Sequence, residues 1–332
     1  MPAKRHHYVP RFLLRRFSSD PLAENPLVWW LDTRSGRLYK STVESVAVIR
    51  HYYRLEELGN FSRTLVEDAL AVVEGWAAKA VRKLAEGEGL NPRDRVNMAT
   101  FLQVQQHRTP VGRASRAPLM VRMALDETEA KLQDPKFAGQ VHEILGESKT
   151  PEELEEWRLT FLAQLQSGQL TLDPGQDAEV SGIFIDADRM APIIAERMTW
   201  VSLRAPHGSA FICSDHPVRF QGDDGRVALV GDWTTSGTKV TVPIDQRICL
   251  RLMPGPPGWE LRTVDAATVE EINLGTYASA QGAIYGPTQQ VVQGVRANVK
   301  RNPTLLAGLR PRPLKLVIPN RSAAGQPTSA RL

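Results

Sequence analysis

The chain has 332 residues, of which 42% are hydrophobic and 23% are charged, and its formal net charge is +4. A chain of this length can bury a substantial core, and this composition excludes a mostly disordered or fibrous protein. The sequence has no run of the ~18 to 20 apolar residues that would span a bilayer.

The N-terminal part of the chain predicts a β-hairpin. Residues 27–55 are rich in β-branched and aromatic residues. Arg34-Ser35-Gly36 interrupts this run and is typical of a turn between two strands.

A block of helices is predicted after the hairpin. The first helix should begin at a capping Ser62, and the second at Asn91-Pro92, because Asn suits the cap and Pro the first helical position. The first helix is expected to bury apolar residues that recur at helical spacing, namely Leu65, Ala69, Val72, Val73, Trp76, Ala80 and Leu84. Four further helices are predicted over residues 112–133, 135–146, 151–167 and 178–197.

After Met198 the pattern changes to short strands separated by Gly, Pro and Asp clusters. Strands are predicted near residues 198–204, 209–213, 226–231, 238–243, 247–253, 259–264 and 282–285, with helices at 265–281 and 288–300. The order indicates an α+β protein with an N-terminal β-hairpin, a central helical block and a C-terminal, mostly antiparallel sheet with helices. We expect a single domain over residues 1–316, with the hairpin and helical block in 1–197 and the sheet-rich part in 198–300.

The charged residues are unevenly distributed. Residues 272–332 contain eight Lys and Arg residues and no Asp or Glu, and the N-terminus is a second basic segment. Such asymmetry would suit a nucleic-acid partner, but it is equally typical of a solvated tail and a basic helix. Residues 317–332 are predicted to be a disordered basic tail.

The expected cellular compartment is the cytoplasm. The two cysteines, Cys213 and Cys249, are too few for a disulfide framework and should pack as small apolar residues. The N-terminal residues, a very short apolar run between basic residues, are not typical of a secretory signal.

Three segments concentrate reactive side chains where predicted elements end. They are Arg5-His6-His7-Tyr8-Val9-Pro10, Gln105-Gln106-His107-Arg108-Thr109-Pro110 and Cys213-Ser214-Asp215-His216-Pro217-Val218. Side chains at element ends can converge on one cleft, and imidazole with carboxylate suits acid–base chemistry or a divalent metal. None of the three segments matches a standard metal motif.

Two carboxylates of the first long helix could join this site. Glu67 and Glu74 are seven residues apart and therefore lie on one helix face. They either face solvent or flank a polar pocket, where they would need a cation or hydrogen-bond donors.

Several of these residues also have structural explanations. His6 would be an exposed member of the basic N-terminus, Arg108 would complement the C-terminal end of its helix, and Asp215 would be a turn residue. Ser214 is not surrounded by a nucleophile-elbow motif.

At these segments the chain resembles a widespread, mostly bacterial family known as a domain of unknown function, whose members open with a His-Tyr-Val-Pro motif. The motif here is His7-Tyr8-Val9-Pro10, and the later segments resemble the family's Gln-x-Arg-Thr-Pro and Ser-Asp-Asn-Pro-Val boxes. Arg11 and His216 depart from the Gln and Asn that are usual in the family. The resemblance spans roughly residues 5 to 290 and implies no activity. The resemblance strengthens the prediction that the matching positions belong to the functional site, and these are His7, Gln106, Arg108, Ser214 and Asp215. Asn273 resembles a late Asn of the family.

The most concrete functional hypothesis is a hydrolase that acts on an anionic, phosphodiester-like or nucleotide-like substrate. Its predicted catalytic residues are His7, Gln106, Arg108 and Asp215. Its predicted substrate-binding residues are Arg108, Ser214 and Asn273. A divalent metal ion, if one is the cofactor, would be held by His7, Glu67, Glu74 and Asp215.

Two alternatives remain open from the sequence. In the first, the chain is a non-catalytic binding or regulatory module in which these residues form a polar core and Arg108 pairs with Asp215. In the second, the basic termini bind nucleic acid. The sequence predicts no membrane partner and does not indicate an oligomeric state.

Overall fold

The computed structural model describes residues 5–53, 55, 65–134, 137, 150–167, 170–171, 175–228, 231–309 and 328–329. The chain divides into two compact units, the first made of residues 1–115 and 176–313 and the second of residues 116–175 and 314–332. The prediction of a single domain over residues 1–316 places parts of both units in one domain, and it stays a prediction. None of the described helices has the length and apolar composition that crossing a membrane requires.

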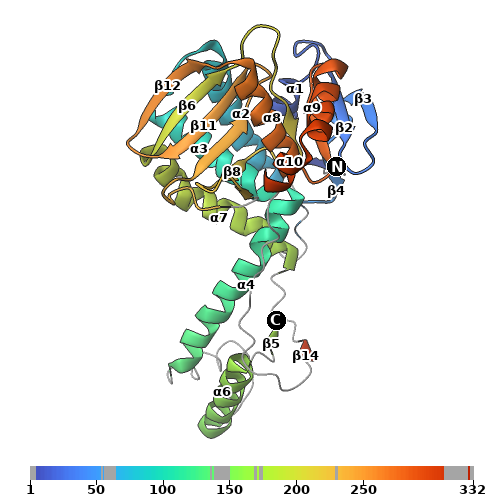
Figure 1. The fold of residues 1–332 in the computed structure, drawn as a ribbon. Coiled ribbons are helices and arrows are strands. Elements are labelled where there is room, and N and C mark those ends of the chain that lie inside the picture. The colour runs from blue at the N-terminus through green and yellow to red at the C-terminus, as the bar shows by residue number, and fades with distance from the viewer. Residues whose placement is uncertain are drawn as a thin grey trace. The chain divides into compact units, whose positions relative to one another are not determined.

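The predicted N-terminal hairpin forms and is extended by strands from the C-terminal half of the chain (Figure 1). Strand β2 pairs antiparallel with β3, and Gly36 in the turn has a φ of 69°, a conformation that glycine adopts without strain. The other neighbour of β2 is β13, which pairs in turn with β7. The strands, in sheet order, are β3 (Leu38–Thr42), β2 (Leu27–Asp32), β13 (Ala283–Gly286) and β7 (Cys213–Ser214).

The N-terminal residues form elements that were not predicted. Strand β1 (Arg5–His7) pairs antiparallel with β4 (Val48–Arg50), and the short helix α1 (Arg11–Arg15) follows. Helix α1 buries Leu13 and Leu14 in the main core, which fixes the segment between β1 and α1.

Two long helices of the first unit, α2 and α3, pack against each other. Helix α2 (Leu65–Glu86) and helix α3 (Pro92–Arg108) are joined by a short turn, and the Asn91 side chain accepts the backbone N–H of Asp94, which confirms the predicted cap. The predicted cap at Ser62 lies outside the described residues. The buried face of α2 differs from the predicted one, because Leu65, Val72 and Trp76 are exposed. The residues that α2 buries are Val66, Leu70, Val73, Ala77, Ala80, Val81 and Leu84.

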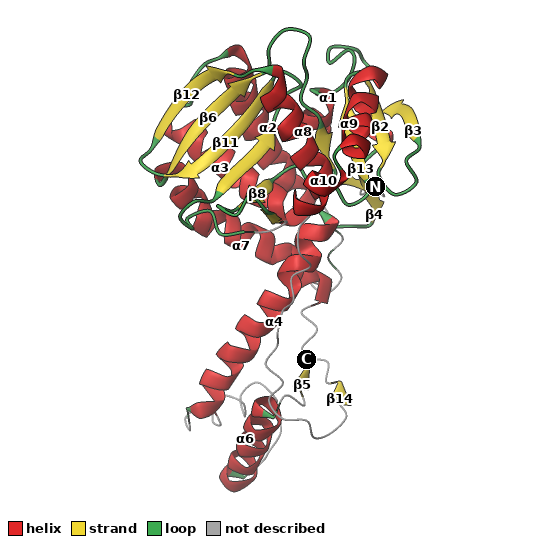
Figure 2. Ribbon diagram, in the orientation of Figure 1, coloured by secondary structure: helices red, strands yellow, loops and turns green. Residues whose placement is uncertain are grey.

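The sheet-rich part forms a second, six-stranded sheet (Figure 2). All neighbouring strands in it are antiparallel except β12 and β6, which are parallel. In sheet order the strands are β12 (Gly258–Thr263), β6 (Met198–Arg204), β11 (Ile248–Pro254), β10 (Lys239–Pro243), β8 (Arg219–Gln221) and β9 (Val227–Ala228). The accompanying helices are α7 (Gly175–Glu196), α8 (Ala266–Ser279), α9 (Gln289–Arg301) and α10 (Pro303–Leu309).

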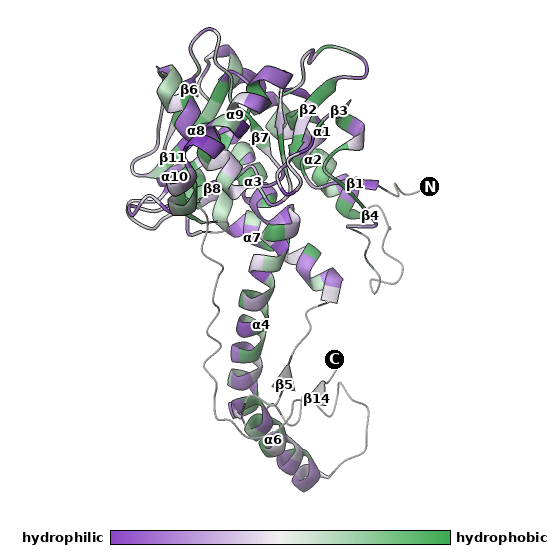
Figure 3. Ribbon diagram, turned by 45° about the vertical axis from the view of Figure 1, so that its right-hand side comes forward, coloured by the Kyte–Doolittle hydropathy of each residue, from purple (hydrophilic) through white to green (hydrophobic). Residues whose placement is uncertain are grey.

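One large apolar core joins α2, α3, α7 and the six-stranded sheet, and hydrophobic residues gather on these elements (Figure 3). A smaller cluster fills the space between α9 and the four-stranded sheet, where Leu31, Ile212 and Ile284 meet Val292 and Val295. Helices and sheets therefore share a core, and the predicted α+β class is confirmed.

The second unit contains most of α4 (Pro110–Gln133), whose first turns belong to the first unit, together with α6 (Pro151–Gln166). Thr150 and Glu153 form a capping box at the start of α6. Strand β5 (Leu170–Thr171) pairs with β14 (Thr328–Ser329), which lies within the predicted disordered tail. The rest of that tail and the predicted helix at 135–146, apart from Phe137, lie outside the described residues.

Candidate functional site

The three segments that concentrate reactive side chains lie against one another. The Nη2 of Arg108 donates to the carbonyl of His7 at 2.6 Å, and the Nε2 of Gln105 donates to the carbonyl of Tyr8 at 2.9 Å. The Thr109 hydroxyl lies 2.7 Å from Nδ1 of His216. Residues about 100 positions apart in the chain are thereby held in one polar layer.

Arg108 is the centre of this layer. It is only 2% exposed, and besides His7 it donates to the Tyr53 hydroxyl at 3.1 Å and to Oε1 of Glu74 at 2.8 Å. Burial opposes the charge of the guanidinium, but Tyr53 and Glu74 outweigh burial and raise the pKa of Arg108. The pairing of Arg108 with Asp215 that the binding-module hypothesis assumed is wrong, because the carboxylate partner is Glu74.

His6 is buried rather than exposed, in contrast to the reading from the sequence. The backbone N–H of Tyr53 donates to its Nδ1 at 2.8 Å, so the ring proton lies on Nε2, which is 2.8 Å from Oε1 of Glu67. The ring also stacks on Tyr53, with 5.4 Å between the ring centroids. Backbone pairing in β1 orients this side chain towards α2.

His7 faces a small open cavity of about 140 Å³, which Glu67, Glu74 and Arg108 also line. Its Nε2 lies 3.3 Å from the carbonyl of Val43. Burial is the main cause that lowers the pKa of His7 below 6.5, so the ring is neutral near pH 7.

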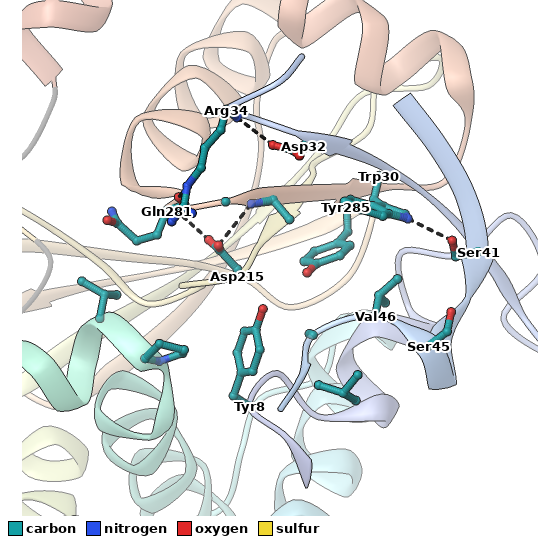
Figure 4. Close-up of a pocket in the computed structure, with 16 residues that line it drawn as sticks. Tyr8, Trp30, Asp32, Arg34, Ser41, Ser45, Val46, Asp215, Gln281 and Tyr285 are labelled. Carbon is teal, nitrogen blue, oxygen red and sulfur yellow. Dashed lines mark hydrogen bonds between the residues drawn. The ribbon is translucent and has the colours of Figure 1, made fainter. Parts of the chain in front are cut away.

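A larger cavity of about 420 Å³, drawn in Figure 4, is lined by Tyr8, the residue that follows His7 in the same N-terminal segment. Its lining residues come from all three segments and from the four-stranded sheet. Tyr8, Pro110 and Asp215 each represent one of the three segments. This volume suits a small-molecule ligand.

Asp215 is the buried carboxyl group of the larger cavity. It is 8% exposed, and its two oxygens accept the backbone N–H groups of Gln281 at 2.9 Å and of Ala283 at 3.1 Å. Burial raises the pKa of Asp215, although these N–H groups favour the ionised form. The balance allows the carboxyl to exchange a proton closer to neutral pH than an exposed aspartate would.

Two tyrosine hydroxyls lie near Asp215. Tyr8 and Tyr285 both line this cavity, and Figure 4 shows the Tyr8 ring pointing between Asp215 and Tyr285. Burial and then the Asp215 charge raise the pKa of Tyr8 to about 12, and burial raises that of Tyr285 well above its usual value. Both hydroxyls therefore keep their protons and can donate hydrogen bonds at neutral pH.

Two hydrogen bonds, one from its N–H and one to its carbonyl, fix the backbone of Tyr8. Its N–H donates at 3.0 Å to the carbonyl of Ala47, whose φ of 53° lies in the left-handed region that a residue with a side chain rarely adopts. Its carbonyl accepts from Gln105. Backbone strain of this kind persists where the surrounding structure over-determines it, as it does at many functional sites.

An aromatic wall and a cation complete the larger cavity. Trp30 stacks on Tyr39 and donates from Nε1 to the Ser41 hydroxyl at 3.0 Å. Arg34 is exposed at the rim and uses its Nε to contact the carbonyl of Gln281 at 3.0 Å. Its terminal nitrogens make no hydrogen bond within the described part of the chain.

The remaining predicted residues lie inside the walls. Ser214 uses its hydroxyl within its own turn, donating to the carbonyl of His216 at 2.8 Å. Asn273 accepts from the N–H of Ile212 and donates to the carbonyl of Ala210, so its amide braces the chain that leads into β7. Gln106 is fully buried, and neither polar atom of its amide has a hydrogen-bond partner within the described residues. Their roles in catalysis or substrate binding stay predictions.

The residues predicted to hold a metal do not line one cavity. His7, Glu67 and Glu74 line the smaller cavity, whereas Asp215 lines the larger one. Within the ranges that the structure describes, no group of three or more His, Cys, Asp or Glu residues is arranged to hold a metal ion.

Several residues of the site were not predicted from the sequence. No role in the site is predicted for Tyr8, and Trp30, Arg34 and Tyr285 are predicted only as parts of strands or of a turn. Tyr8 lies inside the His-Tyr-Val-Pro motif, so that motif contained a signal for it. Trp30 and Tyr285 are directly opposed in the β2–β13 pairing, which joins residues that are far apart in the chain.

Comparison with known proteins supports the resemblance seen in the sequence. A family model described as "Protein of unknown function (DUF4238)" matches residues 5–290. No curated protein and no solved structure matches the chain.

Proposed function

We propose that this chain, which belongs to the DUF4238 family, is a hydrolase that acts on a small anionic substrate in its larger cavity, with Asp215 as the general acid–base. The observation that carries the proposal is a buried carboxyl group of raised pKa beside two protonated tyrosine hydroxyls. Such a combination of perturbed groups in a cavity is typical of active sites.

Asp215 suits proton transfer because its environment brings its pKa towards the operating pH. A general acid–base works best when its pKa lies near that pH. The two backbone N–H groups also fix the orientation of the carboxyl group, so that its proton position is defined relative to the Tyr8 hydroxyl.

The tyrosines and Arg34 would recognise negative charge. The hydroxyls of Tyr8 and Tyr285 are donors in a site of low polarity, where they would stabilise charge that develops on an oxygen in the transition state. The guanidinium of Arg34 at the rim would hold an anionic group of the substrate, and Trp30 would cover an apolar part.

The proposed reaction uses water as the nucleophile. Asp215 as carboxylate takes a proton from water while the water oxygen bonds to the electrophilic phosphorus or carbon and the bond to the leaving oxygen breaks. Asp215 then gives this proton to the leaving oxygen and returns to its starting state. The serines of the cavity are otherwise engaged, since Ser41 accepts from Trp30 and Ser45 donates to the carbonyl of Thr42.

In this proposal His7 and Arg108 are positioning residues. Arg108 holds the carbonyl of His7 and is itself neutralised by Glu74, so it acts on the site through the backbone next to Tyr8. This differs from the predicted role of Arg108 as an anion-binding residue, which Arg34 takes over.

The proposal is tested with bis(4-nitrophenyl) phosphate, 4-nitrophenyl phosphate and 4-nitrophenyl acetate as substrates. Asp215→Asn should reduce turnover by a factor of about 100 or more, in line with the usual contribution of a general acid–base. Asp188→Asn, which changes an exposed carboxylate of α7, should leave turnover unchanged. Equal turnover by wild type and Asp215→Asn would overturn the assignment.

A binding module without chemistry is the second candidate, favoured by the extensive backbone contacts of Asp215 and the engaged serines. It predicts that an anionic ligand binds in the larger cavity without being consumed. Calorimetric titration with wild type and Arg34→Gln, together with analysis of the recovered ligand, distinguishes this function from hydrolysis.

A further inference from the structure

A buried cation in the six-stranded sheet lacks the partners that other buried arginines have. Arg95, for comparison, donates to the carbonyls of Ala195, Gly258 and Met198. Arg219 on β8 is only 4% exposed, yet it makes no hydrogen bond or ion pair within the described part of the chain, and its Nε is buried. A buried charge without a partner is costly, so this position calls for an explanation.

Two residues on the next two strands of the sheet also have buried polar atoms without a hydrogen-bond partner among the described residues. Arg219 is opposite Thr241 on β10, and Thr241 is opposite Arg251 on β11. Directly opposed residues of neighbouring strands project from the same face of a sheet. The hydroxyl of Thr241 and the Nε of Arg251 are also buried without a hydrogen-bond partner among the described residues.

The two guanidinium groups are close enough to influence each other. Burial is the main cause that lowers the pKa of Arg219 to about 10, and the charge of Arg251 lowers it further. Both arginines also act electrostatically on the buried thiol of Cys249. The exposed Glu271 is the acidic residue that acts on Arg219, but it forms no ion pair with it. Arg219 stays cationic at neutral pH, so this face carries two positive charges.

Helix α8 is adapted to the guanidinium of Arg219. The helix packs on β8, as Figure 2 shows. A Cβ atom at Gly275 would lie 1.3 Å from Nη1 of Arg219, so a glycine is required for the cation to occupy this place.

We propose that Arg219, Thr241 and Arg251 form a binding site for an oxyanion, either free phosphate or the phosphate group of an organic ligand. Guanidinium groups bind phosphate oxygens through paired, charge-assisted hydrogen bonds, and the threonine hydroxyl between them supplies a further donor. The anion would satisfy the three unpartnered groups and offset two like charges. This site is separate from the larger cavity and does not depend on the proposed hydrolysis.

The test is calorimetric titration of the full chain with inorganic phosphate at constant ionic strength, with chloride as the reference anion. Wild type should bind one phosphate. Arg251→Gln, at a partly exposed position, and Arg219→Met, which keeps the volume of the buried side chain, should each weaken binding by a factor of about 10 or more. Arg262→Gln is the matched control, because it removes an exposed cation from another strand of the same sheet.

A second titration with phenyl phosphate identifies the source of the anion. Binding of phenyl phosphate that Arg251→Gln also weakens indicates that the site takes the phosphate group of a larger ligand, and binding of inorganic phosphate alone indicates the free ion. Absence of both, or equal phosphate affinity in wild type and Arg251→Gln, would overturn the proposal. Arg251→Gln keeps the test valid if Arg219→Met does not fold.

Discussion

Opposing forces act on the carboxyl group of Asp215. Burial favours the neutral acid, and the backbone N–H groups of Gln281 and Ala283 favour the carboxylate. Burial dominates, so the pKa of Asp215 in the folded protein lies above the 3.8 of an exposed aspartate. Ionisation of Asp215 therefore destabilises the folded state relative to the unfolded state.

This balance predicts a pH dependence of stability. Because the folded pKa is raised, the contribution of Asp215 to the free energy of unfolding is complete below pH 3.8 and is lost as the pH rises through the folded pKa. The difference in unfolding free energy between wild type and Asp215→Asn should consequently fall with rising pH. Urea denaturation of both proteins from pH 4 upward measures it, and a difference that grows with pH would show that the N–H groups outweigh burial.

The contacts of Arg108 predict a large loss of stability when its side chain is removed. Arg108→Ala removes three donations and leaves Glu74 without its cation, so the free energy of unfolding should fall by about 3 kcal/mol or more. Arg122→Ala breaks an exposed pair with Asp126 and should cost less than about 0.5 kcal/mol. Chemical denaturation compares the two variants, and equal losses would contradict the central role of Arg108.

At the level of residues, the sequence indicated which segments form the site, but it did not indicate which cavity each of their side chains lines. Convergence was expected from the positions of His7, Arg108 and Asp215 at element ends. However, His7 and Tyr8 line different cavities although they are neighbours in the chain, and no pattern in the sequence indicates this. The partners Tyr53 and Tyr285 come from tertiary pairing, which no local motif encodes.

Among the elements, helices with clear caps were predicted best. Asn91-Pro92 located the start of α3, because capping is a local interaction, and the predicted start at residue 151 is also that of α6. The buried face of α2 was harder to predict from the sequence. Its apolar residues cover more than one face, so periodicity alone did not show that Val72 and Trp76 would be exposed.

The junction of α3 and α4 provides a test at the level of elements. A Cβ atom at Gly112 would lie 2.0 Å from the carbonyl oxygen of Gln106, so Gly112→Ala should force the helices apart and cost about 3 kcal/mol. Gly75→Ala, in an exposed part of α2 with no neighbouring atom within 4 Å, should instead add about 0.5 to 1 kcal/mol. Thermal unfolding of both variants gives the comparison, and a stabilised Gly112→Ala would disprove the close contact.

For the whole molecule, the four-stranded sheet is the feature that the order of elements did not predict. The hairpin, the helical block and the second sheet were all expected as consecutive parts. The pairing of β2 with β13 joins residues about 250 positions apart, and such non-local pairing depends on the complete fold.

This sheet makes the integrity of the first unit depend on its last elements. A chain that ends after residue 280 lacks β13 and α9, so Leu31 and Ile212 lose the residues that cover them. It should unfold without a cooperative transition, whereas a chain that ends after residue 313 retains the first unit and should unfold cooperatively. Circular dichroism during urea denaturation measures both, and a cooperative transition in the shorter chain would contradict this dependence.

The pairing of β2 with β13 has a consequence for biosynthesis. A ribosome delivers β2 about 250 residues before β13, so one edge of the hairpin stays open while the residues between these strands are made. An unpaired strand edge is prone to aggregation. The nascent protein should therefore benefit from a chaperone that shields this edge until β13 has been made.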